Sequence, residues 1–242
     1  MKQDAALAPI HADMIELLAA ARNAERDLYA MLEPARRDAP GSIGEWSAKD
    51  VLGHLAAWRA VEARRLEARA RGVPPPADDP PPEEPVDDAN ARLHADRSAR
   101  TWDEVVADAD ASVEALTDAI RLSAHDVLCE CEGTVVGIGS SGTNHSMGHL
   151  MDVLTLIDDR GAGERYAAFT REVEGVLARR HLRPRDTGVM LYNIACHHAI
   201  AGNLEEARRL LKLAFVQRPE LVEYAPQDPD LEPLHGEIAA LA

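Results

Sequence analysis

Residues 44–58 read GEWSAKDVLGHLAAW, and this stretch decides how the first two thirds of the chain fold. Ser47 and Asp50 form a pair that resembles a capping box, in which two side chains satisfy free backbone amides at a helix start. The apolar residues that follow recur at steps of three and four, which predicts a helix to about residue 71 with one buried face. His54 falls on that face. A buried imidazole needs a hydrogen-bond partner or a bound ion.

Three further amphipathic patterns accompany this helix. They cover residues 11–33, residues 88–120 with a second capping box at Thr101 and Glu104, and residues 144–159. Aromatic residues make up only 4% of the chain, while Ala, Leu, Arg and Glu, which favour helices, are abundant. We therefore predict an all-α protein in which residues 1–161 form a four-helix bundle.

Two stretches interrupt the helical patterns. Residues 72–90 contain seven prolines and six acidic residues but no basic residue, which predicts a long exposed connection that permits a crossover in the bundle. A specific acidic recognition loop is the alternative. Residues 123–143 contain four glycines and are predicted to be a loop with a short extended piece at 134–138. Gly161 and Gly163 are predicted to end the fourth helix.

Residues 162–242 are predicted to be a second, smaller helical domain. Helices are expected over residues 164–181, 187–201 and 204–217, the last with Asn203 as its N-cap. The stretch 188–219, GVMLYNIACHHAIAGNLEEARRLLKLAFVQRP, resembles a tetratricopeptide repeat. The residues that carry this resemblance are Leu191, Ile194, Ala195, His198, Ala207, Leu211, Ala214 and Pro219. The resemblance implies a helical hairpin that binds a protein partner, and a segment that only packs or dimerises is the alternative.

Charge and cysteine content limit the environment and the partners. The formal net charge of −16 argues against a nucleic-acid partner. Three cysteines, Cys129, Cys131 and Cys196, do not make a disulfide framework and favour a reducing cytoplasm. No apolar run is long enough for a membrane span or a signal peptide. We expect a cytoplasmic protein with a small-molecule substrate, and a homodimer that pairs through helix faces.

Two further histidines supply partners for His54. His145 and His149 are four residues apart, so they lie on one helix face with Cβ atoms roughly 6 Å apart. No glutamate follows the first of them, which excludes the HExxH metalloprotease pattern. Three histidines from two helices suit a catalytic metal, zinc or nickel above all, with positions left open for water or substrate. The alternative is three core histidines that only hydrogen-bond to one another.

Two carboxylates are candidates for orienting these rings. Asp50 lies one turn before His54, and Asp152 lies three residues after His149. Each could accept the second N–H of a ligand histidine. A cap for Asp50 and an exposed helix charge for Asp152 are the alternatives. Cys129 and Cys131 lie in an acidic loop, which raises a thiol's pKa, so neither is assigned a catalytic role.

The stretches GEWSAKDVLGHLAAW and NHSMGHL (residues 144–150) are similar to the DinB-like superfamily, and the first resembles its ClbS/DfsB branch. The superfamily's metal triad carries over to His54, His145 and His149. That branch often has an aromatic residue where Ser146 and Met147 stand here, which concerns the substrate. The resemblance implies a metal-dependent enzyme, either a transferase that uses a low-molecular-weight thiol or a hydrolase that detoxifies a reactive small molecule. A non-catalytic scaffold acting through residues 188–219 is the alternative.

Overall fold

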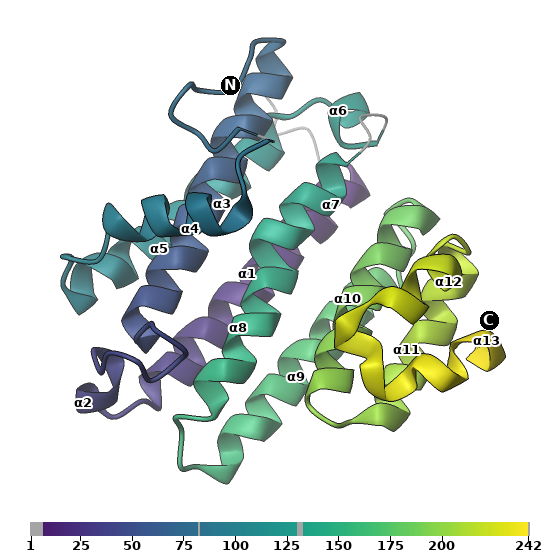
Figure 1. Cartoon of the computed structure of the whole chain (residues 1–242). Coiled ribbons are helices and arrows are strands. Elements are labelled where there is room, and N and C mark those ends of the chain that lie inside the picture. Colours follow the sequence, from purple (N-terminus) through teal and green to yellow (C-terminus); the bar gives the residue numbers. More distant parts are fainter. Residues whose placement is uncertain (1–6, 82, 130–132, 242) are drawn as a thin grey trace.

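The computed structural model describes residues 7–81, 83–129 and 133–241, and its regular elements are all helices (Figure 1). No strand occurs in these three ranges, where an isolated bridge joins Ile43 to Trp46. The predicted all-α class is therefore confirmed. Across the same ranges, no helix is both long and apolar enough to cross a bilayer.

Four amphipathic helices contribute most of the core in the first part of the molecule. They are α1 (Pro9–Ala30), α3 (Ala48–Arg71), α5 (Trp102–Leu122) and α8 (His145–Leu154), joined by the short α2 (Pro34–Arg37) and other segments. Helix α3 packs along α5, and α1 contacts both α5 and α8. The apolar stripes of these helices meet in a core that excludes water, which is the main source of stability in such an arrangement.

Both predicted capping boxes form. The Ser47 hydroxyl accepts the Asp50 amide at 3.1 Å, and the Asp50 carboxylate accepts the Ser47 amide at 3.0 Å. Thr101 and Glu104 exchange the same two bonds at the start of α5. The first residues of helices α3 and α5 are therefore determined by side chains only three positions apart, which is why the sequence predicts these helix starts well.

The prediction of a loop over residues 123–143 is wrong. This stretch contains α6 (His125–Cys129), α7 (Thr134–Gly139) and a π-helical turn, η1 (Ser140–Asn144), that runs directly into α8. Helices α7 and α8 form one long teal helix through the middle of Figure 1. The predicted extended piece at 134–138 is helical as well.

Close packing explains the glycines in this helix. A Cβ atom on Gly137 would lie 3.0 Å from a Glu62 carboxylate oxygen, and one on Gly142 would lie 3.1 Å from a Leu18 methyl. Gly139 meets Met190 of α10 (Pro184–Ile200) in the same way, at 3.2 Å. These glycines therefore let neighbouring helices approach, and they do not mark a turn.

The proline-rich connection is exposed over part of its length only. Residues 86–95 fold as α4 (Val86–Ala95), which packs on α3, and Trp58 Nε1 donates to Asn90 Oδ1 at 2.9 Å. Two of the acidic side chains in the connection that was predicted to be exposed are paired with arginines. Asp79 is buried against Arg64, and Glu84 lies 2.9 Å from Arg92.

The remaining helices cover one side of this core. They are α9 (Arg160–Leu177), α10 (Pro184–Ile200), α11 (Leu204–Gln217), α12 (Leu221–Tyr224), η2 (Ala225–Gln227), η3 (Pro229–Glu237) and α13 (Ile238–Leu241). Asp159 caps α9 by accepting the Gly161 amide at 2.7 Å, so Gly161 begins a helix and does not end one. Asn203 is the N-cap residue of α11, as predicted, but its side chain makes no capping hydrogen bond.

The second part packs tightly on the first. Helix α9 lies along α1, and α10 contacts α7, η1 and α8, as Figure 1 shows. One cluster of buried apolar residues runs through both parts, including Leu17 of α1, Val173 of α9 and Ile194 of α10. Helices α10 and α11 pack on each other as a hairpin. The division at residue 161 and the repeat assignment stay predictions.

Candidate metal centre

Three histidine side chains converge between α3 and α8. The Nε2 atoms of His54 and His145 lie 2.9 Å apart, and one ring nitrogen from each of His54, His145 and His149 lies within 4.8 Å of the others. The ring centroids are 4.6 to 5.1 Å apart. This cluster, called the histidine triad below, is a group that could hold a metal ion.

Burial keeps the inner two rings of the triad neutral. The pKa of His54 falls to about 3, with burial as the largest cause and the neighbouring His149 and His94 as further causes. Burial also holds the pKa of His145 well below its ordinary value, with His54 as the next cause. A neutral imidazole has one lone pair available on a ring nitrogen. His54 and His145 therefore present lone pairs near neutral pH without first releasing protons.

The protein does not satisfy the triad on its own. If His145 donates to His54 Nε2, the Nδ1–H of His54 is left over; if His54 donates, its Nδ1 lone pair is left over. That Nδ1 is buried and has no hydrogen-bond partner. A buried polar atom without a partner costs free energy. The set of three nitrogen donors fits an ion bound among the rings.

The two candidate carboxylates differ in position. Asp152 Oδ2 lies 3.4 Å from His149 Nδ1, a long contact that still leaves His149 Nε2 free for the centre. Asp50 does not touch His54, because its carboxylate binds Ser47 and faces His94 Nε2 at 3.2 Å. It acts on the triad only indirectly, through His94.

A stack of rings links Asp50 to the triad. His94 lies parallel to Trp46 with ring centroids 5.4 Å apart, and Trp46 packs on His54 at 4.8 Å. From the sequence His94 has no assigned role, because it stands in a polar context. Trp46 thus covers the outer side of His54 and supports its orientation.

Open pockets meet the triad at His145. A pocket of about 580 Å³ lies between α8 and the C-terminal helices, and His145, Tyr192 and Asp228 are part of its wall. Pockets of about 220 and 330 Å³ border His54 and His149 respectively, and His145 lines both. Concave, partly apolar sites of this size are where proteins bind small molecules. A ligand could therefore reach the triad.

A second polar cluster beneath the triad was missed by sequence reasoning. Glu25 and Arg59 are fully buried and form an ion pair. Arg22 lies 3.1 Å from Glu25, and the Ser146 hydroxyl lies 2.7 Å from it. We call Arg22, Glu25, Arg59 and Ser146 the buried ion network.

A sequence signal for this network existed. Glu25 stands four residues after Ala21 and three before Leu28, on the apolar stripe of α1, and Arg59 stands four after Leu55 on that of α3. Charged residues at stripe positions are rare unless they are paired. Two opposite charges on the stripes of neighbouring helices therefore predict a buried pair.

His197 of α10 was likewise assigned only packing or exposure. Its Nε2 donates to the Asn144 carbonyl at 3.2 Å, and its ring touches Gly148, where a Cβ atom would lie 2.9 Å from it. Burial lowers its pKa to about 4. His197 thus joins α10 to the turn that precedes His145.

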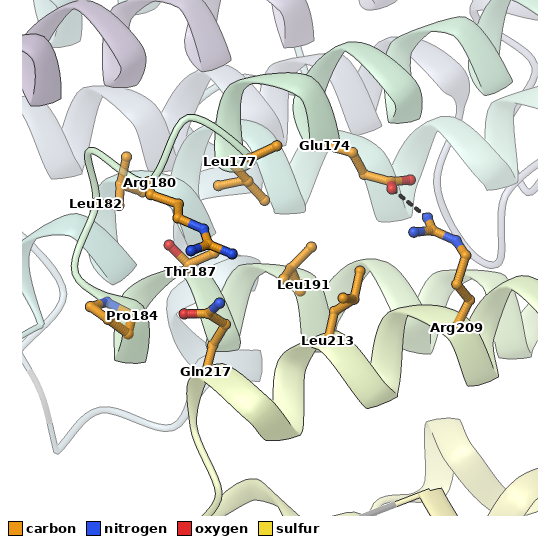
Figure 2. A pocket seen from close by; sticks show the side chains of 11 residues that line it. Glu174, Leu177, Arg180, Leu182, Pro184, Thr187, Leu191, Arg209, Leu213 and Gln217 are labelled. Carbon is orange, nitrogen blue, oxygen red and sulfur yellow. Dashed lines mark hydrogen bonds and ion pairs between the residues drawn. The ribbon is translucent and has the colours of Figure 1, made fainter.

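A groove elsewhere in the second part shares no wall residue with the pockets at the triad. It has a volume of about 370 Å³ and lies among α9, α10 and α11 (Figure 2). Leu177, Leu191 and Leu213 give it an apolar floor, and Arg209 pairs with Glu174 at one end (Figure 2).

The two cysteines of the acidic loop have no assigned role in the site. Cys129 lies 3.4 Å from His125, while Cys131 is outside the described residues.

Comparison with protein-family models, curated proteins and solved structures finds no match to this chain. The resemblances to the DinB-like superfamily and to the tetratricopeptide repeat therefore depend on the quoted residues alone.

Proposed function

We propose that this protein is a metal-dependent enzyme with His54, His145 and His149 as the ligands, acting as a hydrolase or a thiol transferase on a reactive small molecule. The convergence of three ring nitrogens within 4.8 Å, beside open pockets, carries the proposal. The similarity of the two histidine-bearing stretches to the DinB-like superfamily supports the same reaction classes.

Three imidazoles suit zinc or nickel and leave coordination positions open. A bound ion would supply Lewis acidity, which lowers the pKa of a water or a low-molecular-weight thiol. The chain's own residues prepare the site. Asp152 orients His149 through Nδ1, and the Trp46 ring shields His54 from water.

Metal analysis of protein purified without a histidine tag tests this proposal. We expect about one zinc or nickel ion per chain in the wild type, and its loss in His54→Ala and His149→Ala. His181→Ala is the matched control, because His181 pairs with Asp13 and is not part of the triad. This replacement should leave the metal content unchanged. A wild type that takes up neither metal after reconstitution would refute the enzyme proposal.

A second candidate function is a scaffold that binds a protein through residues 188–219. The groove in Figure 2 favours it, together with the exposed Leu213 and Val216 on α11. Analytical ultracentrifugation of the full chain separates the homodimer from a monomer that awaits a partner. If α11 forms the dimer interface, Leu213→Glu with Val216→Glu should yield a monomer. An unchanged sedimentation coefficient would exclude this face as the interface.

A further inference from the structure

The largest of the pockets that border the triad is built from both parts of the chain. His145 and Asn144 line it from the α8 side, and Tyr192 of α10 lines it from the other. Tyr224, Asp228 and Asp230 complete its wall. We call it the acidic pocket. Its volume of about 580 Å³ is within the range of small-molecule sites.

The charge in this wall is not compensated by the protein. Among the described residues that line the acidic pocket there is no lysine or arginine, whereas Asp228 and Asp230 are both part of its wall. Asp228 is buried, and its oxygens accept the Asp230 amide at 3.1 Å and the Tyr192 hydroxyl at 2.8 Å. Both donors are neutral, so they stabilise the carboxylate without cancelling its charge.

Two aromatic rings stand next to these carboxylates. The centroids of Tyr192 and Tyr224 are 6.1 Å apart and their planes are tilted by 52°. Tyr192 is buried in the wall, while Tyr224 is 57% exposed. Tyrosine faces attract cations, and organic cations gain most because they shed water easily. Acidic and aromatic groups together therefore favour an organic cation.

An unused acceptor lies in the same wall. Asn144 is only 5% exposed, and its Oδ1 has no hydrogen-bond partner. A buried acceptor in this state costs free energy that an N–H donor of a ligand would recover. Asn144 directly precedes His145, so a ligand that reaches this amide also approaches the triad.

We propose that the acidic pocket binds a small organic cation, a primary amine or a guanidinium, between Asp228, Asp230 and the two tyrosine rings. Binding of the cation depends on this pocket alone. Its further role as the substrate, held with its reacting group toward His145, rests on the enzyme proposed above.

A metal ion in this pocket is the competing occupant. Cys196, Asp228 and Asp230 offer ligand atoms within 4.8 Å of one another. Cys196 could be a ligand only as its thiolate. Burial, followed by the charge of Asp228, raises the pKa of the Cys196 thiol, and its Sγ lies 3.8 Å from an Asp228 oxygen as a donor. The two tyrosine rings also favour the organic cation, because their faces attract it.

Calorimetry on the full chain, first stripped of metal with a chelator, tests the proposal. Three probes of one shape are compared: 2-phenylethylammonium, 2-phenylethanol and phenylacetate. We expect the cation to bind at least about tenfold more tightly than the alcohol, and the anion not to bind. Equal affinity for the cation and the alcohol would overturn the proposal.

Variants locate the binding. Asp228→Asn and Asp230→Asn keep the shape of the side chains, and asparagine still caps η3, so each should weaken the cation about tenfold while leaving thermal unfolding near that of the wild type. Tyr224→Leu, at an exposed position, should weaken it several-fold. Glu114→Gln on α5 removes one equal charge and should change nothing. Wild-type affinity in both aspartate variants would refute the site.

Two further measurements separate the proposals. His54→Ala should bind the cation as the wild type does, even if the triad never holds metal, so this inference and the enzyme can fail independently. Zinc is titrated into a His54→Ala, His149→Ala double variant. Tight zinc binding there that Cys196→Ser abolishes would assign the pocket to a metal and overturn the organic cation.

Discussion

The histidine triad and the buried ion network lie next to each other, share helices α3 and α8, and handle buried polarity in opposite ways. In the network, the charge of Glu25 is opposed by Arg59 and Arg22, and Ser146 also contacts it. In the triad, three groups of one kind face one another and leave His54 Nδ1 without a partner. The protein thus supplies opposite charges within the network, even though Arg59 Nε and Nη1 have no hydrogen-bond partner, whereas the triad brings together only ring nitrogens that an added ion could bind.

This difference teaches which buried polar cluster to regard as a binding site. Burial alone does not distinguish them, since Glu25 and Arg59 are even less exposed than the histidines. Access and complementarity do, because pockets border the triad and none of those pockets includes Glu25 or Arg59 in its wall. The following experiments would break or sharpen this contrast.

Removal of the central carboxylate should have the largest effect. Glu25→Ala leaves the buried Arg59 guanidinium without its carboxylate, while Arg22 keeps Asp110, and we expect a loss of about 3–5 kcal/mol in the free energy of unfolding. Urea unfolding followed by circular dichroism measures this. Glu16 lies on the same helix as Glu25 and is a half-exposed partner of Arg179, so Glu16→Ala should cost far less. Equal losses in the two variants would show that the network is not complemented as described.

Metal should stabilise the triad side alone. An ion that binds only the folded chain adds about 4 kcal/mol at a thousandfold excess over its dissociation constant. The thermal midpoint of the wild type should therefore rise on addition of zinc or nickel, and that of His149→Ala should not. Glu25→Ala, if it stays folded, should keep the increase. A metal-induced increase that survives in His149→Ala would remove the triad as its cause.

Glu62 is a buried carboxyl group that belongs to neither the triad nor the network, and its protonation is changed by burial. Burial raises the pKa of Glu62 to about 7, against the opposing effect of Arg65 and Arg69. The folded state therefore binds a proton that the unfolded state has released between pH 4.5 and about 7, so this group lowers stability as the pH rises through that window.

Glu62→Gln should accordingly stabilise the protein by up to about 3 kcal/mol above pH 8, and by almost nothing near pH 4.5. Urea unfolding at both pH values gives the comparison, with Glu67→Gln on the same helix as the control. A stabilisation of the same size at both pH values would contradict proton uptake by Glu62.

Replacement of Asp152 should have the smallest effect. Its contact with His149 Nδ1 is long, at 3.4 Å, so Asp152→Asn should weaken metal binding by about tenfold, at the low end for such partners. Competition with a chromogenic chelator measures the affinity. Unfolding without metal should not change, and Asp118→Asn on α5 should leave both quantities unaltered. An affinity as low as that of His149→Ala would make Asp152 a ligand in its own right.

Local features of the fold could be predicted from sequence, and long-range ones could not. The capping boxes at Ser47 and Thr101 are complete within four residues, so no distant contact can override them. Gly137 and Gly139 indicate a loop by composition, yet they are helical because Glu62 and Met190 occupy the space of their missing side chains. Such a cause lies 75 and 51 residues away and leaves no local pattern.

The candidate site divides in the same way. The spacing of His145 and His149 predicts that they share a face, and the position of His54 on an apolar stripe predicts that it points inward. The support from His94 could not be predicted, since it depends on how α4 folds back over α3. Nor could the acidic pocket, because its wall combines residues from both parts of the chain.

The π-helical turn Ser140–Asn144 sets the phase between α7 and α8. Each residue of an α-helix adds about 100° of rotation. If α7 keeps its packing on α10, deletion of one residue from this turn would give an unbroken α-helix and would swing His145 and His149 more than a quarter turn away from His54. The histidine triad thus depends on the length of this turn as much as on the three ligand side chains. Variants that keep the length of the chain are the ones that test the chemistry of the triad.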